Sequence, residues 1–514
     1  MATKNEKGVA LILTMILLVV LSVMAVSLLF MGQSETWSSM NYRMMTQTRY
    51  GAEAGIHQAA NFLQSTSYTS PNAAQIAANF DTTKSPLTYG GAPAVLSANS
   101  SIGASNFPIS SDKTNFAANA AGSLTAGNTT VNYKPYAKLL AIQSFTAYPS
   151  TAPAVVEKWE ITSDGTISGV RNAQVRVSAI MERQKTAVFS YAAFADATGC
   201  DALTFGGGGT TNSYDSSTVT NAGTPSASVT TQAYGGNVGT NGNLDEKGAS
   251  TVIYGSLSTP RSGTGSCSSS NVTALTLSGA VQPSQGLVEL PQNITYPTPD
   301  APNPAPPTNT AMTVANSNPS CSGIPSCSII NGGKEMQINA SGTQAGATLL
   351  GDLTVKGTVH FTPPSTASAG SNVYININSL STNAGGVIYI DPIPGTTNQY
   401  ANIILNVAGS GSSAPIDMNG NSNINNYSLN PSTFQILYAG TAQVTLNGGA
   451  AAAALLYAPN AAVKFAGNSD FYGAVIANHI TDMGGAAIHY DRRLQSEFYG
   501  LGNYMLSAFN WQKY

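Results

Sequence analysis

Two aspartates and two histidines near the carboxyl end have side chains of the kind that acid–base chemistry uses. Asp470, His479, Asp482 and His489 fall within one short stretch. Polysaccharide lyases and hydrolases need two carboxylates that face one groove, often beside a lysine or an arginine. The two aspartates are twelve residues apart, and a repeat of nineteen residues in this stretch would not place them in one column. We therefore interpret all four as corner and turn residues.

No other pattern in the chain predicts an active site. The sequence has no Gly-x-Ser-x-Gly elbow, no Walker loop, no Gly-x-Gly-x-x-Gly fingerprint and no repeated calcium motif. Four consecutive glycines at 206–209 lack the strand-to-helix context of a phosphate loop. We predict that the protein is not an enzyme, and that it binds no metal and no cofactor.

The four cysteines offer a second kind of chemistry. Cys200, Cys267, Cys321 and Cys327 all follow the long apolar segment that begins the chain, and in an exported region they are expected to form disulfides. Three connectivities are possible, and the short loop between Cys321 and Cys327 favours that pair, which leaves Cys200 with Cys267. A metal site is the alternative, although no histidine lies close to a cysteine pair. The histidines are at positions 57, 360, 479 and 489.

Length and composition limit the classes of protein to consider. A chain of 514 residues exceeds a single hydrophobic core, so at least two domains are expected. Charged residues make up 9%, well below the roughly 25% of a typical soluble domain, and the net charge is −3. No basic patch predicts a nucleic-acid partner. Short apolar runs within 42% hydrophobic residues argue against disorder.

The elements that would position these residues begin with an apolar amino-terminal segment. Val9–Met31 has 23 residues and no charge, and about 20 helical residues span a bilayer. The segment is longer than a secretory signal and has no small-residue cleavage site after it. Lys4 and Lys7 precede it and Glu35 follows it, so the amino end is expected in the cytoplasm.

The helical pattern continues beyond the membrane segment. Apolar and small residues recur every three or four positions, which predicts a single helix over 9–63, about 80 Å long. Its outer half would carry an apolar stripe that needs a partner surface. The stripe comprises Trp37, Met40, Met44, Thr48, Ala52, Ile56, Ala59 and Leu63.

A short basic leader ending in Lys7-Gly8, the apolar run, the amphipathic extension and the Ala-Glu-Ala-Gly motif at 52–55 together resemble PilX-type minor pilins of the type IV pilin family. The resemblance implies that a prepilin peptidase removes residues 1–8 and that Val9 becomes the methylated amino terminus. It also implies a place in the bacterial inner membrane, then in a pilus at the cell surface, with other pilins as partners.

One position departs from the family pattern. Most pilins carry Glu at the fifth mature position, where it pairs with the terminal amine of a neighbouring subunit, and here that position is Leu13. Such a subunit fits best at a filament tip or in an initiating complex, although packing alone could insert it anywhere along the fibre. The candidate helix-packing residues are Leu13, Trp37, Met44 and Glu53.

Residues 64–187 are expected to form a pilin-like α/β region. The runs EKWEITS and AQVRVSA alternate apolar and polar side chains, which predicts strands on either side of a Ser-Asp-Gly turn at 163–165. This resembles the small sheet that pilins pack against the outer half of their long helix. The sheet would then cover the stripe from Trp37 to Leu63.

Residues 188–495 are predicted to form a large β head. The stretches 436–449 and 455–468 align at an offset of 19, which favours stacked coils of a β-solenoid, that is, a right-handed parallel β-helix. A β-sandwich is the alternative. The Pro- and Thr-rich stretch 281–331 is expected to be an extended excursion, and the aromatic tail 496–514 is expected to cap the last coil.

The predicted fold is therefore α+β and mainly β, with a long pilin helix, a small pilin-like β region and a solenoid head. We predict a minor pilin-like structural protein that acts in pilus assembly or initiation and in adhesion or aggregation, with a tip adhesin or a surface polysaccharide as a further partner. Alternatives are a tip pseudopilin of a type II secretion-like system, a membrane-anchored carbohydrate-active enzyme, and a surface protein that the peptidase never processes.

Overall fold

The computed structural model describes residues 7–126, 129–150, 153–168, 172–383, 385–418, 423–447, 452–467 and 470–513. The first six residues of the predicted leader lie outside the described residues. The chain divides into two compact units. The first comprises Met1–Thr146, Ala152–Thr186 and Leu501–Tyr514, and the second comprises Ala147–Thr151 and Ala187–Gly500.

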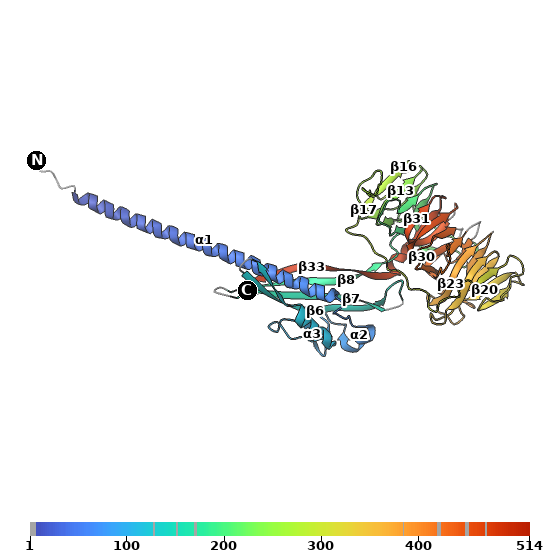
Figure 1. The fold of residues 1–514 in the computed structure, drawn as a ribbon, viewed down its shortest axis with the longest axis horizontal. Coiled ribbons are helices and arrows are strands. Elements are labelled where there is room, and N and C mark those ends of the chain that lie inside the picture. The colour runs from blue at the N-terminus through green and yellow to red at the C-terminus, as the bar shows by residue number, and fades with distance from the viewer. Residues whose placement is uncertain are drawn as a thin grey trace. The chain divides into compact units, whose positions relative to one another are not determined.

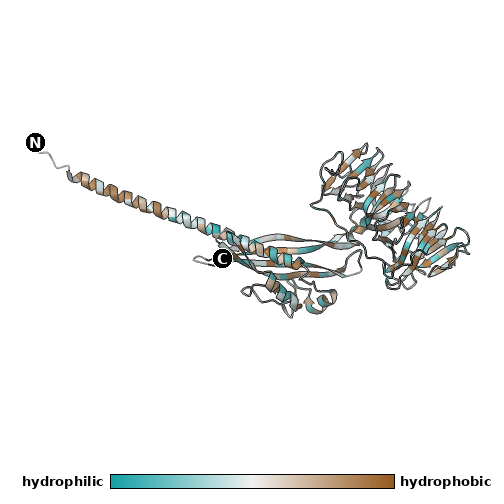
Figure 2. Ribbon diagram, viewed as in Figure 1, coloured by the Kyte–Doolittle hydropathy of each residue, from teal (hydrophilic) through white to brown (hydrophobic). Residues whose placement is uncertain are grey.

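One long helix begins the first unit. α1 runs from Lys7 to Gln64, and Figure 1 shows it without a break. No proline precedes Pro71, so no ring interrupts the helical hydrogen bonds. Among the described residues, α1 is the one helix long and apolar enough to cross a membrane. Its first half has the colours of apolar residues in Figure 2, and polar residues appear further along.

An antiparallel sheet packs against the second half of α1. Its strand order is β33-β8-β7-β6-β4, and β5 also pairs with β6. Alternate side chains of its central strands, such as Trp159 and Ile161, are fully buried in one core with the helix. The elements of this unit besides α1 are α2 (Ala73–Asn79), β1 (Phe80–Asp81), β2 (Thr88–Tyr89), β3 (Ala92–Pro93), β4 (Val95–Ser97), α3 (Ser110–Asn119), β5 (Gly122–Ala126), β6 (Thr129–Thr146), β7 (Pro153–Ile167), β8 (Ala173–Ala187) and β33 (Tyr499–Lys513).

The predicted Ser-Asp-Gly turn is wrong. β7 continues through residues 163–165 as one strand and pairs with both β6 and β8 along this stretch. Asp164 accepts hydrogen bonds from Nε and Nη2 of Arg176 on β8 at 2.7 and 2.9 Å, and from Nδ2 of Asn99 at 3.1 Å. A paired, buried aspartate is compatible with a strand interior, so the turn propensity of this tripeptide is overridden.

The prediction for the carboxy-terminal tail 496–514 is wrong from Leu501 onward, whereas Phe498 does pack against the core of the second unit. β33 does not cap the head; it joins the sheet of the first unit beside β8. Tyr504 and Leu506 pack against the core that α1 and this sheet share. An unpaired β8 would expose a row of N–H and C=O groups, and the tail satisfies them.

Parallel pairing organises the second unit. Among the described residues, its strands form a 19-stranded sheet and a 5-stranded sheet, and the named pairs are parallel except β19 with β20. This is not the antiparallel pairing of the β-sandwich alternative. The 19-stranded sheet contains β9 (Ala193–Ala195), β10 (Leu203–Phe205), β11 (Thr210–Tyr214), β12 (Val238–Thr240), β13 (Leu244–Lys247), β14 (Val252–Ile253), β15 (Leu257–Thr259), β16 (Leu275–Ser278), β17 (Leu287–Glu289), β18 (Ala311–Val314), β21 (Thr348–Val355), β23 (Asn372–Thr382), β25 (Asn402–Val407), β26 (Ile416–Met418), β28 (Phe434–Tyr438), β29 (Val444–Asn447), β30 (Ala453–Ala466), β31 (Asp470–Asp482) and β32 (Ala487–Asp491). The 5-stranded sheet contains β19 (Cys327–Ile330), β20 (Glu335–Asn339), β22 (Thr358–Thr362), β24 (Val387–Ile390) and β27 (Asn423–Asn425).

The spacing between paired strands varies along the unit. Val444 pairs with Val463, which is the offset of 19 seen in the sequence, whereas Gln435 pairs with Leu455 at an offset of 20. Other strands differ, since β23 pairs with β25 at an offset of 30, while β12 pairs with β15 at an offset of 19. Loops of different lengths between similar strands hide this regularity from a search for a fixed period.

The order of the strands does not follow the order of the chain. We call a set of successive strands that stacks on another set a tier. The first tier, β9 to β11, pairs on one side with the second tier, β12 to β14, and on the other side with the last tier, β31 and β32. The second unit therefore begins with a tier that lies inside the stack, and its final tier pairs with its first tier.

The stretch 281–331 is not one extended excursion. β17, β18 and β19 fall within it and pair with other strands, so that part of the prediction is wrong. Its proline-rich part, 290–310, runs along the stack and forms hydrogen bonds with several tiers. These bonds join Asn241 Nδ2 to the Ile294 carbonyl, Tyr457 OH to the Pro297 carbonyl, Asn460 Nδ2 to Thr298 Oγ1 and Asn376 Nδ2 to the Pro304 carbonyl.

Candidate functional site

The first half of α1 is an uncovered apolar surface. Gly8 and Val9, the predicted processing residues, lie in its first turns, and Val9 is 63% exposed. Leu13 is also 63% exposed. The large apolar side chains from Val9 to Met31 are 48–69% exposed in this chain. Such a surface is stable only in lipid or against other apolar helices.

The second half of α1 is covered from Thr48 onward. Thr48, Ala52 and Ile56 are fully buried, whereas Trp37 is 56% exposed and Met44 is half-buried. The predicted cover of the whole stripe is therefore wrong for its first part. The described strands reach α1 over its last turns, where the sheet residues of the shared core lie.

Glycines set the close approach between helix and sheet. A Cβ atom on Gly51 would lie 2.3 Å from Cγ1 of Val131, and one on Gly55 would lie 2.2 Å from Oγ of Ser163. On the sheet side, a Cβ atom on Gly165 would lie 2.2 Å from the Thr48 carbonyl oxygen. The Ala-Glu-Ala-Gly motif thus has a packing role in this chain, because small residues let the two backbones meet.

Glu53 lies at the edge of this contact. Its Oε1 is 2.8 Å from Nε of Arg49, one turn earlier on α1. An exposed pair of this kind contributes about 0.3–0.5 kcal/mol, so it adds little to the packing itself.

A buried carboxylate holds the segment after α1 on the sheet. Glu157 on β7 accepts a hydrogen bond from Tyr68 OH at 2.8 Å and another from Trp159 Nε1 at 3.0 Å. Burial raises the pKa of the Glu157 carboxyl above its ordinary value, against the opposing effect of these bonds. Nothing in the sequence pattern marks this cluster, because its members are 89 residues apart along the chain.

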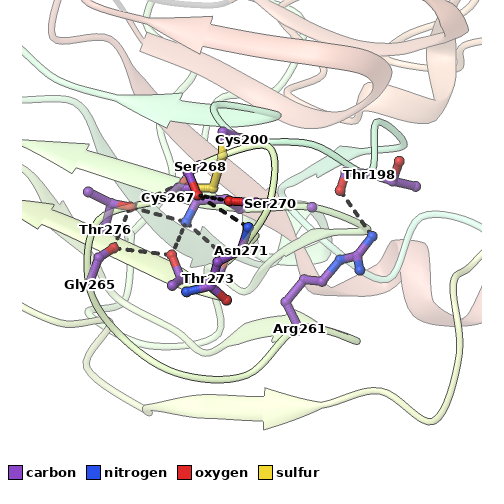
Figure 3. Close-up of a disulfide and its surroundings, with 12 residues drawn as sticks. Thr198, Cys200, Arg261, Gly265, Cys267, Ser268, Ser270, Asn271, Thr273 and Thr276 are labelled. Atoms are coloured by element: carbon purple, nitrogen blue, oxygen red, sulfur yellow. Dashed lines mark hydrogen bonds between the residues drawn. A yellow bond between two sulfur atoms is a disulfide. The ribbon is translucent and has the colours of Figure 1, made fainter.

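The structure pairs Cys200 with Cys267, the connectivity expected from the sequence. Figure 3 shows this disulfide beside the loop that precedes β16. The loop is also held by its own bonds, because the Gly265 carbonyl accepts from Thr273 Oγ1 at 3.1 Å and from Thr276 Oγ1 at 2.9 Å. The disulfide therefore joins the first tier to a loop two tiers further along the chain.

The second disulfide joins Cys321 with Cys327. Cys327 is the first residue of β19, which runs antiparallel to β20. This closed loop and β19 precede the other four strands of the 5-stranded sheet along the chain. β19 is the edge strand of the 5-stranded sheet.

The two candidate carboxylates lie at opposite ends of one strand. Asp470 and Asp482 begin and end β31, and they pair with different neighbours, Ala487 and Phe205. Asp470 Oδ1 is 3.2 Å from His489 Nε2, so this aspartate is engaged with a histidine. Asp482 is fully buried, and burial raises its pKa to about 6.

A histidine that sequence reasoning did not single out has two carboxylate neighbours. His360 Nδ1 is 2.9 Å from Asp391 Oδ1, and its Nε2 is 3.1 Å from Glu335 Oε2. Its ring stacks on Tyr389 with centroids 4.6 Å apart. These bonds to carboxylates raise the pKa of His360, although burial opposes them. The described residues contain no group of three or more His, Cys, Asp or Glu suited to a metal ion.

Comparison with known proteins identifies two segments of the chain. Residues 7–57 match the PilX N-terminal family, which confirms the resemblance of this segment to PilX-type minor pilins. Residues 395–497 match a domain of unknown function, DUF7305. A comparison with curated proteins gives no match.

A comparison with solved structures gives a weak match over most of the chain. It is the competence-associated pilin ComZ from Thermus thermophilus, which is 11% identical, and the match covers 92% of this chain and 98% of that chain. The TM-score is 0.30, which is too low to support an argument about fold.

Proposed function

We propose that this chain, whose residues 7–57 match the PilX N-terminal family, is a minor pilin-like subunit of a type IV pilus. One observation carries the proposal: the matched segment is a continuous helix whose first half is apolar and uncovered, while its second half packs on the chain's own sheet. A helix of this form can rest in the inner membrane and later pack against the helices of other pilins.

Processing would follow at the start of α1. We propose that a prepilin peptidase cuts between Gly8 and Val9 and that Val9 becomes a methylated amino terminus. Removing the leader takes away Lys4 and Lys7, so the remaining helix begins with apolar residues that suit a filament core.

Leu13 supports a place at or near the tip. A leucine at this position cannot form an ion pair with the terminal amine of another subunit, so the subunit would be tolerated best where that pair is not needed. The large second unit also suits low copy number, because more than 300 residues between Ala187 and Gly500 would have to be repeated at each position.

The second unit would be the displayed part. We propose that its parallel tiers are coils of a β-solenoid, since each tier buries apolar side chains against the next. Its outer surface would serve adhesion or aggregation, towards a tip adhesin or a surface polysaccharide.

The mass of the mature amino-terminal peptide tests the proposal. Protein from sheared surface fibres of the native host should lack Met1–Gly8 and carry a methyl group on Val9. A Gly8→Arg variant should keep its leader, stay in the membrane fraction and disappear from the fibres. Recovery of the full leader on protein in the fibres, or absence of the protein from fibres altogether, would contradict the proposal.

A further inference from the structure

One end of the stack in the second unit has an uncovered strand. β17 pairs with β15, and Figure 1 shows β16 and β17 at one end, beyond β13. All three residues of β17 are exposed, with Leu287 at 43% and Val288 at 47%, and nearby Val281 is 54% exposed. The edge strand of the 5-stranded sheet differs, because β19 runs antiparallel to β20 and begins at Cys327, which a disulfide joins to Cys321. Proteins normally cover or charge such edges, whereas two of the three residues of β17 are apolar and only Glu289 is charged.

The hydrogen bonds between β15 and β17 show which main-chain groups of β17 face away from β15. The Leu257 N–H donates to the Gly286 carbonyl, which fixes the alternation of this parallel pair. By that alternation the main-chain groups of Val288 face β15, and those of Leu287 and Glu289 face away. The outward N–H and C=O groups are those that an added strand would bind, so the edge fits a β-strand.

We propose that this edge pairs with the same edge of a second copy of the chain. An antiparallel pair about a two-fold axis at Val288 would let Leu287 exchange both main-chain hydrogen bonds with Glu289 of the second copy. Val288 would then face its own counterpart.

The low charge of this edge favours a second copy over a partner strand that carries many charges. A two-fold contact brings each residue near its own kind, so charged edges repel when they pair with themselves. Residues 275–288 contain no charged side chain. The one charged residue of β17, Glu289, would face Leu287 and not the other Glu289.

A single introduced cysteine tests this geometry in the full-length chain. The four native cysteines are paired, so Val288→Cys would add the one free thiol. Residues opposite each other in a non-hydrogen-bonded pair have Cα atoms about 4.5 Å apart, and disulfides join Cα atoms about 4.4–6.8 Å apart. In detergent with a mild oxidant, Val288→Cys should give a covalent dimer on a non-reducing gel. Ile329→Cys, which replaces an exposed residue of β19, is the matched control and should stay monomeric.

Sedimentation provides the second measurement. Val288→Lys places two like charges at the axis and should weaken self-association of the full chain by about tenfold or more, a free-energy change of about 1.4 kcal/mol. Association through α1 would persist in Val288→Lys and would not favour Val288→Cys cross-links. The proposal fails if the two cysteine variants cross-link equally, if neither does, or if Val288→Lys associates like the unchanged protein.

Discussion

At the scale of single residues, Glu246 is the least compensated side chain in the second unit. It is fully buried on β13 between Phe205 and Leu277 of the neighbouring strands, and neither carboxylate oxygen has a hydrogen-bond partner among the described residues. A charged carboxylate in such a place has a large desolvation cost, so the group holds its proton. Burial raises the pKa of Glu246 to about 8.

This carboxyl makes the stability of the second unit depend on pH. Its pKa is higher in the folded protein than the ordinary value of 4.5, so the folded state binds the proton more tightly. Its contribution is fully present below about pH 4.5 and is lost as the pH rises through about 8. We expect thermal unfolding to show a lower Tm at pH 8 than at pH 5, and Glu246→Gln to reduce that difference.

The exposed Glu289 supplies the control for this measurement. Glu289→Gln changes the same functional group on the surface of β17, where water solvates the carboxylate, and should leave the pH dependence unchanged. Equal pH dependence in the unchanged protein and in Glu246→Gln would contradict the assignment.

At the scale of elements, the contact of α1 with β7 depends on Gly165. The alternation of apolar and polar side chains on either side of Gly165 was visible in the sequence. The role of Gly165 was not, because Ser-Asp-Gly is also typical of a turn. Only the position of Thr48 on the helix shows why a glycine is needed in the strand. A property that belongs to two elements far apart in sequence cannot be derived from either one alone.

Gly165→Ala should separate α1 from the sheet. The added Cβ would meet the Thr48 carbonyl oxygen at 2.2 Å, and this backbone atom cannot rotate away. Overpacking of this kind costs about 1–3 kcal/mol, which denaturant unfolding of the first unit would measure. Gly32→Ala is the control, because nothing lies within 4 Å of a Cβ there and α1 is exposed around it. Equal stability of the two variants would show that the close approach is not required.

The tail β33 shows another limit of sequence reasoning at this scale. Its aromatic and apolar residues predicted packing, and Tyr504 and Leu506 do pack. The surface they pack on could not be chosen, because the open edge of β8 and an open end of the head would both accept a strand. The chain connection decides it: the second unit is inserted between β8 and β33 of one sheet.

At the scale of the whole molecule, the periodic parts were the predictable parts. The apolar run of α1 could be recognised because helix geometry fixes its period. The repeat near the carboxyl end of the second unit, where Val444 pairs with Val463, could be recognised because the paired strands have matching residues at a constant offset. Clusters such as Glu157 with Tyr68, and His360 with Glu335, could not, because they depend on register between distant segments. The position of the first tier inside the stack also depends on pairing between distant segments, so the sequence did not predict it.

The buried place of the first tier predicts an unusual pattern of hydrogen exchange. In a stack built in chain order, the first tier is at an end and its amides exchange early, as frayed ends do. Here β10 has β13 on one side and β31 on the other, whereas β17 pairs with β15 and has an open edge. In the Val288→Lys variant, in which this edge stays unpaired, we therefore expect amides of β9 to β11 to exchange at least about tenfold more slowly than those of β16 and β17, a difference of about 1.4 kcal/mol in local opening. Mass spectrometry of peptides from the full chain would measure both regions in one experiment. Early exchange in 193–214 would show that the last tier does not close on the first.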